Sequence, residues 1–374
     1  MSDSVELNQN NNNMFQKKHD SKMVNNKRKF SEDSLFKPMT PSIGPKFFKP
    51  NVANGSTNKF ERESVSKQRK NLPIATAKPK FIEQATQHQS LVLVGETGSG
   101  KTTQIPQFLL ESGLCKPGKC IGITQPRRVA AISLAQRVGL ERGQASQVGY
   151  RVRFEDSTTE ETRIIYQTDG MLLREAMLDP MLSKYSWVIL DEAHERTVST
   201  DILFGVIKSA QEKRSNNFTK NPLKVIVMSA TLDAKKFSEY FKNCPILHVI
   251  GRQYTINVMH VTETKDDWQT AVLETVIKIH KESPAKEDIL VFLTGQEEIE
   301  SMVSTLKNIF LNEDKIKAVI MPLYAAQQVN AQKKVFGVTK EGSRKIILAT
   351  NIAETSITIP GIKHVIDSCR VKAK

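Results

Sequence analysis

The sequence is poor in cysteine and contains no long apolar run. Its four cysteines, Cys115, Cys120, Cys244 and Cys369, are too few for a disulfide framework in 374 residues. Cys115 and Cys120 also lack the paired spacing of a zinc site, so we predict buried or idle thiols. No apolar run approaches the length of a membrane span, and no signal-peptide pattern opens the chain. We therefore expect a soluble intracellular protein without a membrane partner.

The positive charge of the chain is unevenly distributed. The formal net charge is +14, from 54 Lys and Arg against 40 Asp and Glu. Residues 1–70 hold 14 of the basic and 7 of the acidic residues, which is half of the surplus. A basic surplus favours a polyanionic partner such as a nucleic acid, although a solvated surface explains the charge equally well.

Residues 1–70 are predicted to be a disordered basic tail. They contain the polar run Asn8–Asn13 and few aliphatic residues, so they cannot bury enough surface to offset the entropy of ordering. Within them, Lys17-Lys18 and Lys27-Arg28-Lys29 match a two-cluster nuclear import signal, a pattern that basic tails also produce by chance. Nuclear localisation is one expectation, and the cytoplasm is the other.

From residue 72 onward, short β-branched runs alternate with longer helix-like stretches. The runs predicted as strands are 91–94, 121–123, 163–166, 187–190 and 224–228, and then 289–293, 318–323, 345–349 and 364–366. Such runs are expected of parallel strands that helices cover on both faces. The two series predict an α/β fold with two lobes, residues 71–250 and 251–374, joined near Gly251–Asn257. No solenoid-type repeat is visible.

A glycine-rich segment comes directly after the first predicted strand. Residues Gly95, Glu96, Thr97, Gly98, Ser99, Gly100, Lys101 and Thr102 fit the pattern G-x-x-x-x-G-K-[ST] completely. Glycines let backbone N–H groups turn toward phosphate oxygens, and a following helix adds a favourable dipole. Lys101 is expected to reach the β- and γ-phosphates, and the Thr102 hydroxyl to coordinate Mg2+. The alternative is a chance glycine-rich turn, which the strand-to-helix setting disfavours.

Two carboxylates come directly after the predicted strand 187–190. Asp191 and Glu192 are placed as in a phosphate-loop enzyme, which uses such a pair to hold Mg2+ and polarise water. By this interpretation Asp191 lies in the metal shell and Glu192 is the candidate general base. The alternative is an ordinary acidic helix start.

These two segments are accompanied by five others. They are Thr124–Ala131 (TQPRRVAA), Thr168–Glu175 (TDGMLLRE), Ser229–Thr231 (SAT), Leu293–Ile299 (LTGQEEI) and Thr350–Ile359 (TNIAETSITI). With Asp191-Glu192-Ala193-His194, the chain resembles the DEAH-box RNA helicases over residues 72–374. Within that family it looks most like members with a short N-terminal arm that act on ribosomal RNA in the nucleolus. The resemblance implies tandem RecA-like lobes, ATP and Mg2+ as cofactors, and single-stranded RNA as partner, and it leaves a protein activator open.

The resemblance also implies roles for individual residues. Lys101, Thr102 and Thr103 would bind phosphate and Mg2+, with Asp191 and Glu192 on metal and water. His194 and Ser229-Ala230-Thr231 would link the nucleotide site to lobe movement. Family adenines lie between an arginine and an aromatic ring, here Arg137 and Phe336, although core packing explains Phe336 equally well. The positions that match RNA-backbone contacts are Arg127, Arg128, Gly170, Thr294, Thr350 and Asn351.

The chain departs from the family pattern in three places. Ala325–Val329 replaces a Gly-Ser-Leu-Pro-Pro segment, and Pro360 stands where some members have an aspartate. The chain also stops at Lys374, before the motif that supplies the family's arginine fingers, so we expect slow turnover by a truncated second lobe. The main expectation is an RNA-stimulated ATPase and helicase. The alternatives are a shortened, non-catalytic RNA- or partner-binding form and a DNA-directed motor.

Overall fold

A computed structural model describes residues 68–216, 221–230, 233–251, 255–261, 263, 266–311, 316–337, 339–354 and 358–372. The predicted tail features Asn8–Asn13, Lys17-Lys18 and Lys27-Arg28-Lys29 lie outside these residues, and so does Thr231. Among the residues described, no helix is both long enough and apolar enough to cross a membrane.

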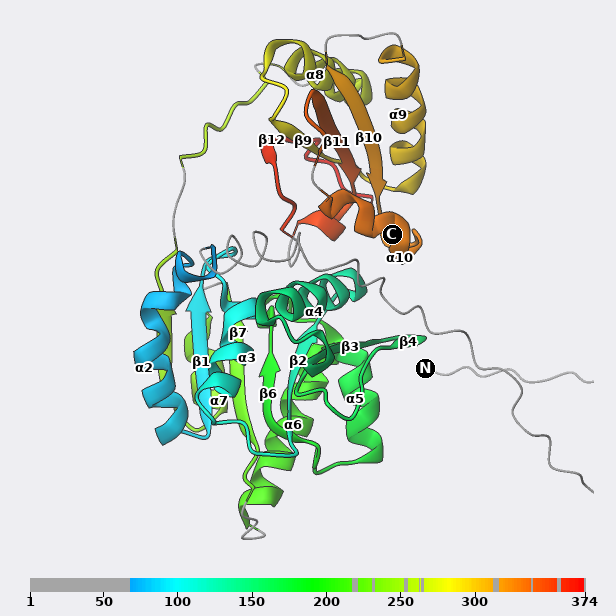
Figure 1. The fold of residues 1–374 in the computed structure, drawn as a ribbon. Helices are drawn as coiled ribbons and strands as arrows, with labels where there is room; N and C mark the ends of the chain where they lie inside the picture. Colours follow the sequence, from blue (N-terminus) through cyan, green and yellow to red (C-terminus); the bar gives the residue numbers. More distant parts are fainter. Residues whose placement is uncertain are drawn as a thin grey trace, which may run out of the picture. The chain divides into compact units, whose positions relative to one another are not determined.

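The first lobe is built on an eight-stranded sheet with the order β4-β3-β5-β2-β6-β7-β1-β8 (Figure 1). Its strands are β1 (Ser90–Gly95), β2 (Cys120–Gln125), β3 (Val148–Val152), β4 (Glu155–Asp156), β5 (Ile164–Thr168), β6 (Tyr185–Leu190), β7 (Lys224–Ser229) and β8 (Ile246–Val249). All pairs are parallel except that between β3 and β4. The helices are α2 (Ile74–Gln87), α3 (Lys101–Glu111), α4 (Arg128–Arg142), α5 (Asp169–Leu178), α6 (Val198–Asn216) and α7 (Ala234–Tyr240).

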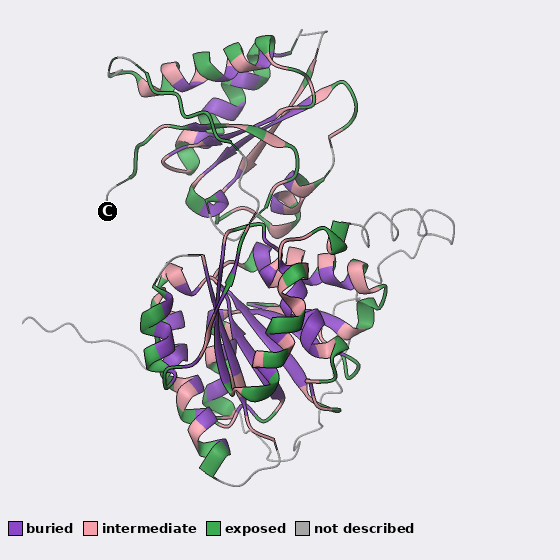
Figure 2. Ribbon diagram, turned by 90° about the vertical axis from the view of Figure 1, so that its left-hand side faces the viewer, coloured by how far each residue is buried: buried purple, intermediate pink, exposed green. Residues whose placement is uncertain are grey.

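Helices cover both faces of this sheet, because alternate residues of each strand point in opposite directions. Leu91 and Leu93 of β1 belong to one buried cluster, with residues of α2, α3 and α4. Val92 and Val94 belong to the other, with residues of α5, α6 and α7. Figure 2 shows the result, a buried sheet between helices whose outer sides are exposed.

The second lobe has a smaller parallel sheet with the order β10-β11-β9-β12. Its elements are α8 (Trp268–Glu282), β9 (Asp288–Phe292), α9 (Gln296–Ile309), β10 (Lys317–Leu323), α10 (Val329–Lys333), β11 (Ser343–Ala349) and β12 (Ile362–Asp367). The Asp267 side chain accepts a hydrogen bond from the Thr270 amide and so caps α8. The predicted α/β fold with two lobes is confirmed.

Three strands of the first lobe, β3, β4 and β8, were not predicted from the apolar pattern. β3 contains Gly149 and the half-buried Arg151, and β8 contains the exposed His248, so neither gives a continuous apolar run. Both β4 and β8 are edge strands, which are covered less completely than the central strands. The prediction of buried thiols is confirmed for Cys115 and Cys120, which are both buried; Cys244 is also buried, whereas Cys369 is exposed.

Candidate functional site

The glycine-rich loop joins the end of β1 to the start of α3. Gly98 and Gly100 have φ angles of 80° and 92°, a region that side chains with a Cβ rarely adopt. A Cβ on Gly100 would also lie 2.9 Å from Leu72 Cδ1. The Ser99 hydroxyl donates to the Glu96 carbonyl at 2.8 Å, which closes the loop from inside. The loop therefore needs glycine at positions 98 and 100 and ends at the N-terminus of an 11-residue helix.

Lys101 opens this helix and turns its side chain back into the loop. Its Nζ donates to the carbonyls of Gly95 and Glu96, the latter at 2.8 Å, and the residue is buried. Burial lowers the pKa of Lys101, while the nearby Asp191 and Glu192 carboxylates oppose that shift. The result is a cation held beside acidic groups inside a loop of backbone amides.

Asp191 lies directly after β6 and is the point where three segments converge. The Thr102 hydroxyl and the Gln125 amide each donate to Asp191 Oδ2 at 2.6 Å, and the Glu192 amide donates to Oδ1 at 2.9 Å. Asp191 is buried, and burial raises its pKa against the effect of these donors. Hydroxyl and carboxylate oxygens are the ligands that Mg2+ takes in proteins, so Thr102 and Asp191 fit this ion.

Glu192 occupies the left-handed region, with φ of 52°. Burial and then repulsion by Asp191 raise the pKa of its carboxyl group. His194 Nε2 lies 3.4 Å from Glu192 Oε2, and the Ala230 amide donates to His194 Nδ1 at 3.3 Å. Because Nδ1 accepts, the neutral ring carries its proton on Nε2, toward Glu192. His194 thus connects the carboxylate to the segment after β7.

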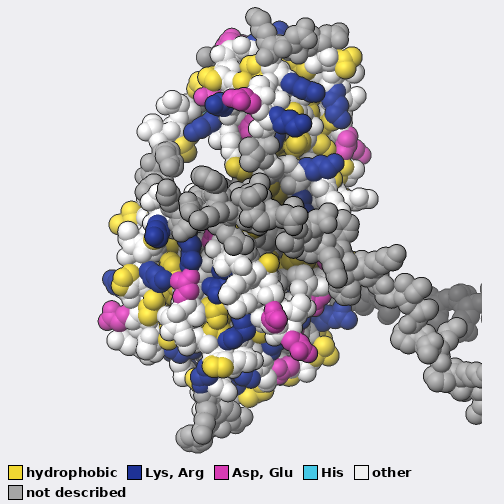
Figure 3. Space-filling view, in the orientation of Figure 1, with side chains coloured by type: hydrophobic (Ala, Val, Ile, Leu, Met, Phe, Trp, Pro, Cys, Tyr) yellow, Lys and Arg dark blue, Asp and Glu magenta, His cyan; other side chains and the backbone are white. Residues whose placement is uncertain are grey.

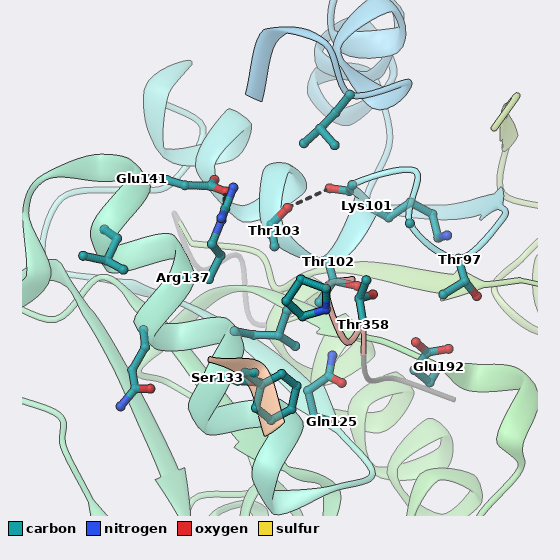
Figure 4. A pocket seen from close by; sticks show the side chains of 18 of the residues that line it. Thr97, Lys101, Thr102, Thr103, Gln125, Ser133, Arg137, Glu141, Glu192 and Thr358 are labelled. Atoms are coloured by element: carbon teal, nitrogen blue, oxygen red, sulfur yellow. Dashed lines mark hydrogen bonds and ion pairs between the residues drawn. The ribbon is translucent and has the colours of Figure 1, made fainter. Parts of the chain in front are cut away.

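The predicted base-stacking residues both line a cavity of about 580 Å³. Arg137 of α4 reaches it from the first lobe, together with Lys101, Thr102 and Glu192 (Figure 4). Phe336 lines it from the second lobe and also packs on a core cluster that includes Val335.

The residues predicted to contact RNA lie where parallel strands end. In the first lobe, Arg127 and Arg128 come after β2, and Gly170 comes after β5, the neighbouring strand. In the second, Thr294 comes after β9, and Thr350 and Asn351 come after its neighbour β11. On the face shown in Figure 3, basic side chains of the first lobe are interspersed with acidic ones, so its charge is not concentrated there.

One feature beside Gly170 was not predicted from the sequence. The turn from β3 to β4 carries Phe154, which is 90% exposed and has a φ of 69°. The Arg153 guanidinium lies 4.8 Å from its ring centroid. Because β3 pairs in parallel with β5, this turn and Gly170 both lie at the C-terminal ends of their strands, on the same side of the sheet. The sequence signal is Arg151-Val152-Arg153-Phe154, an aromatic residue after alternating arginines.

Comparison with known proteins agrees with this arrangement. Residues 76–240 match the DEAD/DEAH box helicase family, and residues 269–372 match the helicase conserved C-terminal domain. This chain belongs to the DEAH-box RNA helicase family. Its two parallel-sheet lobes are therefore the tandem RecA-like lobes of that family.

Several helicases are similar to this DEAH-box chain over most of its length. It is 53% identical over 329 residues to the mouse ATP-dependent RNA helicase DHX33, covering 87% of this chain and 47% of the relative. The human DHX33 is 54% identical over 316 residues, covering 83% and 44%. The Schizosaccharomyces pombe pre-mRNA-splicing factor ATP-dependent RNA helicase prp22 is 49% identical over 325 residues, covering 86% and 27%. The chain thus spans about half the length of the DHX33 relatives, or less.

Proposed function

We propose that this chain is the motor part of an ATP-dependent RNA helicase and that it hydrolyses ATP when it binds single-stranded RNA. The observation that carries this proposal is the convergence of Thr102, Gln125 and Glu192 on the buried Asp191, beside Lys101. A buried carboxylate beside a phosphate-type loop suits a nucleotide with a metal ion far better than it suits a purely structural core.

The phosphates of ATP would bind at the start of α3. Lys101 would exchange its loop carbonyls for phosphate oxygens, and the backbone amides of the loop would face the same anion. The residues proposed to surround the nucleotide are Gly95, Glu96, Thr97, Gly98, Ser99, Gly100, Lys101, Thr102 and Thr103. Thr102 and Asp191 would hold Mg2+, with Glu192 nearby, and the ion would neutralise charge on the phosphates.

Glu192 is proposed as the general base that accepts a proton from the attacking water. Its raised pKa brings it closer to the working pH, where a general base is most effective. His194 would couple changes at this carboxylate to the segment Ser229-Ala230-Thr231, because its ring accepts a hydrogen bond from the Ala230 amide. The base of the nucleotide would stack on Arg137, with Phe336 as the opposing ring.

RNA would lie along the strand ends of both lobes. Arg127, Arg128 and Gly170 are proposed contacts on the first lobe, and Thr294, Thr350 and Asn351 on the second. We add Phe154, because an exposed aromatic ring offers a stacking platform for a base without selecting its identity. We propose a role in ribosomal RNA or other ribonucleoprotein remodelling in the nucleus, including the nucleolus. The relative prp22 is named a pre-mRNA-splicing factor, which fits work on a ribonucleoprotein.

The deciding experiment measures phosphate release from ATP by the purified chain, with and without single-stranded RNA and single-stranded DNA. The proposal expects turnover that RNA stimulates more than DNA does and that Glu192→Gln abolishes while ADP still binds. RNA binding without any ATP binding would support a non-catalytic RNA-binding protein instead. Equal stimulation by DNA would indicate a motor without preference for RNA.

A further inference from the structure

Glu141 is an acidic side chain that the proposed chemistry does not use, yet it is almost completely enclosed. It lies near the end of α4, and its side chain is 1% exposed. Glu141 Oε2 accepts hydrogen bonds from the side-chain amides of Gln104 and Gln107, both at 2.8 Å. A carboxylate is costly to bury, so one kept at this place must have its acceptors satisfied.

The other oxygen of Glu141 holds Arg137, one helical turn earlier. Arg137 Nε donates to Glu141 Oε1 at 2.7 Å, and Arg137 Nη2 donates to the Gln68 side chain at 3.1 Å. The Arg137 side chain is 42% exposed, so its outer part stays open to the cavity that both residues line. Figure 4 shows the carboxylate of Glu141 beside the guanidinium of Arg137.

Glu141 also connects α4 to the phosphate-binding end of the site. Gln104 and Gln107 both belong to α3, the helix that begins with Lys101. Gln104 donates in addition to the Thr103 hydroxyl at 3.0 Å, and its own oxygen accepts from Arg69. One carboxylate therefore fixes the position of Arg137 relative to the helix that would carry the phosphates.

We infer that Glu141 is the positioning residue of the nucleobase site. It holds the guanidinium plane of Arg137 so that the base of a bound nucleotide stacks on it without first ordering a flexible arginine. This role rests on the proposed function, in which Arg137 contacts the base. Its contribution is preorganisation, because a side chain that is already fixed loses little entropy when the ligand binds.

Glu141→Gln keeps the size of the side chain but removes one acceptor. One of the two oxygens becomes an amide that donates, and it then faces either Arg137 or the amides of Gln104 and Gln107, which also donate. The variant should bind ADP more weakly, by at most the five- to thirtyfold expected for losing a whole cation–π contact of about 1–2 kcal/mol, because the guanidinium of Arg137 remains but is no longer held. Inorganic tripolyphosphate, which has no base, should bind to the variant and to the parent chain equally.

The test is a set of equilibrium titrations with ADP and with tripolyphosphate, on the full chain with Mg2+ present. The variants are Glu141→Gln, Arg137→Ala, the double variant and Lys101→Ala. If Glu141 acts through Arg137, the double variant loses no more ADP affinity than Arg137→Ala alone. Glu111→Gln is the matched control, because Glu111 is a glutamate held by Arg69 and Lys78 that does not touch Arg137.

Three results would overturn the inference. They are unchanged ADP affinity in Glu141→Gln, an equal loss for ADP and tripolyphosphate, or a further loss of ADP affinity when Glu141→Gln is added to Arg137→Ala. If Glu141→Gln does not fold, Glu141→Asp replaces it in the test, because aspartate keeps the negative charge but has a shorter side chain. Its ADP affinity should lie below that of the parent, and parental affinity would count against the inference. Lys101→Ala separates a failure of this inference from a failure of the proposed function. If Lys101→Ala bound ADP as well as the parent chain does, the proposed nucleotide site itself would be wrong.

Discussion

Thr102 and Asp191 are 89 residues apart in the sequence and are joined by a hydrogen bond of 2.6 Å. Thr102 lies in the first turn of α3, after β1, and Asp191 lies directly after β6. Only β7 separates these two strands in the sheet. The two motifs meet because parallel strands end at one edge of the sheet, where the loops after neighbouring strands lie close together.

Replacing Lys101 with alanine should remove useful nucleotide affinity while preserving the fold. Its side chain is buried beside Asp191 and Glu192, and its ammonium is the cation proposed to contact the phosphates. We expect ADP affinity to fall by on the order of a hundredfold, as for the loss of two charge-assisted hydrogen bonds. Isothermal titration measures this. Lys235→Ala, at a lysine whose side chain is 87% exposed, is the control and should bind ADP like the parent chain.

Glu192→Gln should stabilise the protein near neutral pH. The folded-state pKa of Glu192 is raised by burial and by Asp191, while in the unfolded chain it takes its ordinary value of about 4.3. Stability is therefore lost as the pH rises from the unfolded pKa toward the folded one, by about 1.4 kcal/mol for each pKa unit of difference. The glutamine variant lacks this loss.

Thermal unfolding at several pH values tests the expectation. The difference between Glu192→Gln and the parent should be absent below about pH 4, should grow as the pH rises, and should level off only above the folded-state pKa of about 8. Glu212→Gln, at a glutamate of α6 whose side chain is 44% exposed, should show no such trend. A pH-independent gain would mean that the variant stabilises through packing and that the carboxylate is not perturbed.

Much of the site could be predicted because it depends on local patterns. A glycine-rich phosphate loop lies between a strand and a helix, and the two carboxylates directly follow a buried strand. Lys101, Thr102 and Asp191 could therefore be picked out from the sequence alone. Strands with continuous apolar runs, such as β6 and β7, were also found. Their order in the sheet was not, because it depends on which strands pair across the chain.

The contacts between distant polar residues could not be predicted from the sequence. Glu141 appears there as an ordinary acid at the end of a helix, and only the fold brings Gln104 and Gln107 to it. Phe154 was missed because β3 lies near the edge of the sheet and contains polar residues, so the exposed turn after it was not expected. The assignment of individual site residues to ATP, Mg2+ and RNA stays a prediction until it is measured.

Gly122→Ala should destabilise the first lobe, although a β-strand ordinarily accepts alanine in place of glycine. A Cβ at this position would lie 2.8 Å from Tyr185 Cε1 on the adjacent strand. Tyr185 cannot easily move, because its hydroxyl donates to Glu175 at 2.5 Å and accepts from Gln167 at 3.0 Å. We expect a loss of about 1–3 kcal/mol in the free energy of unfolding, as for overpacked cores. Chemical denaturation checks this value.

Gly205→Ala is the matched control for that substitution. Gly205 lies inside α6, and the nearest atom to an added Cβ is the Tyr240 hydroxyl at 3.9 Å. Alanine there should stabilise the protein by about 0.5–1 kcal/mol, because it restricts the unfolded chain and suits a helix. Equal effects of the two substitutions would show that Tyr185 gives way and that β2 and β6 are packed loosely.

Phe154→Ala should weaken the binding of single-stranded RNA without changing the binding of ADP. Stacking of a base on an aromatic ring contributes about 1–3 kcal/mol, so the affinity should fall about five- to a hundredfold.

Arg127→Ala should instead reduce the salt dependence of RNA binding, by about 0.7 in the slope of log K against log salt for each phosphate contact. Fluorescence anisotropy with a labelled oligonucleotide, measured across a salt series, separates the two effects.

The control for Phe154→Ala is Tyr240→Ala, which removes another exposed ring that is paired with a cation. Lys208 Nζ lies 4.1 Å from the Tyr240 ring centroid, but α7 comes after β7 and is remote in the sheet from β3 and β5. Tyr240→Ala should therefore leave RNA affinity unchanged. A loss of RNA affinity in Tyr240→Ala but not in Phe154→Ala would mean that RNA does not run past the ends of β5 and β3. The contacts assigned to Arg127, Arg128 and Gly170 would then need another path.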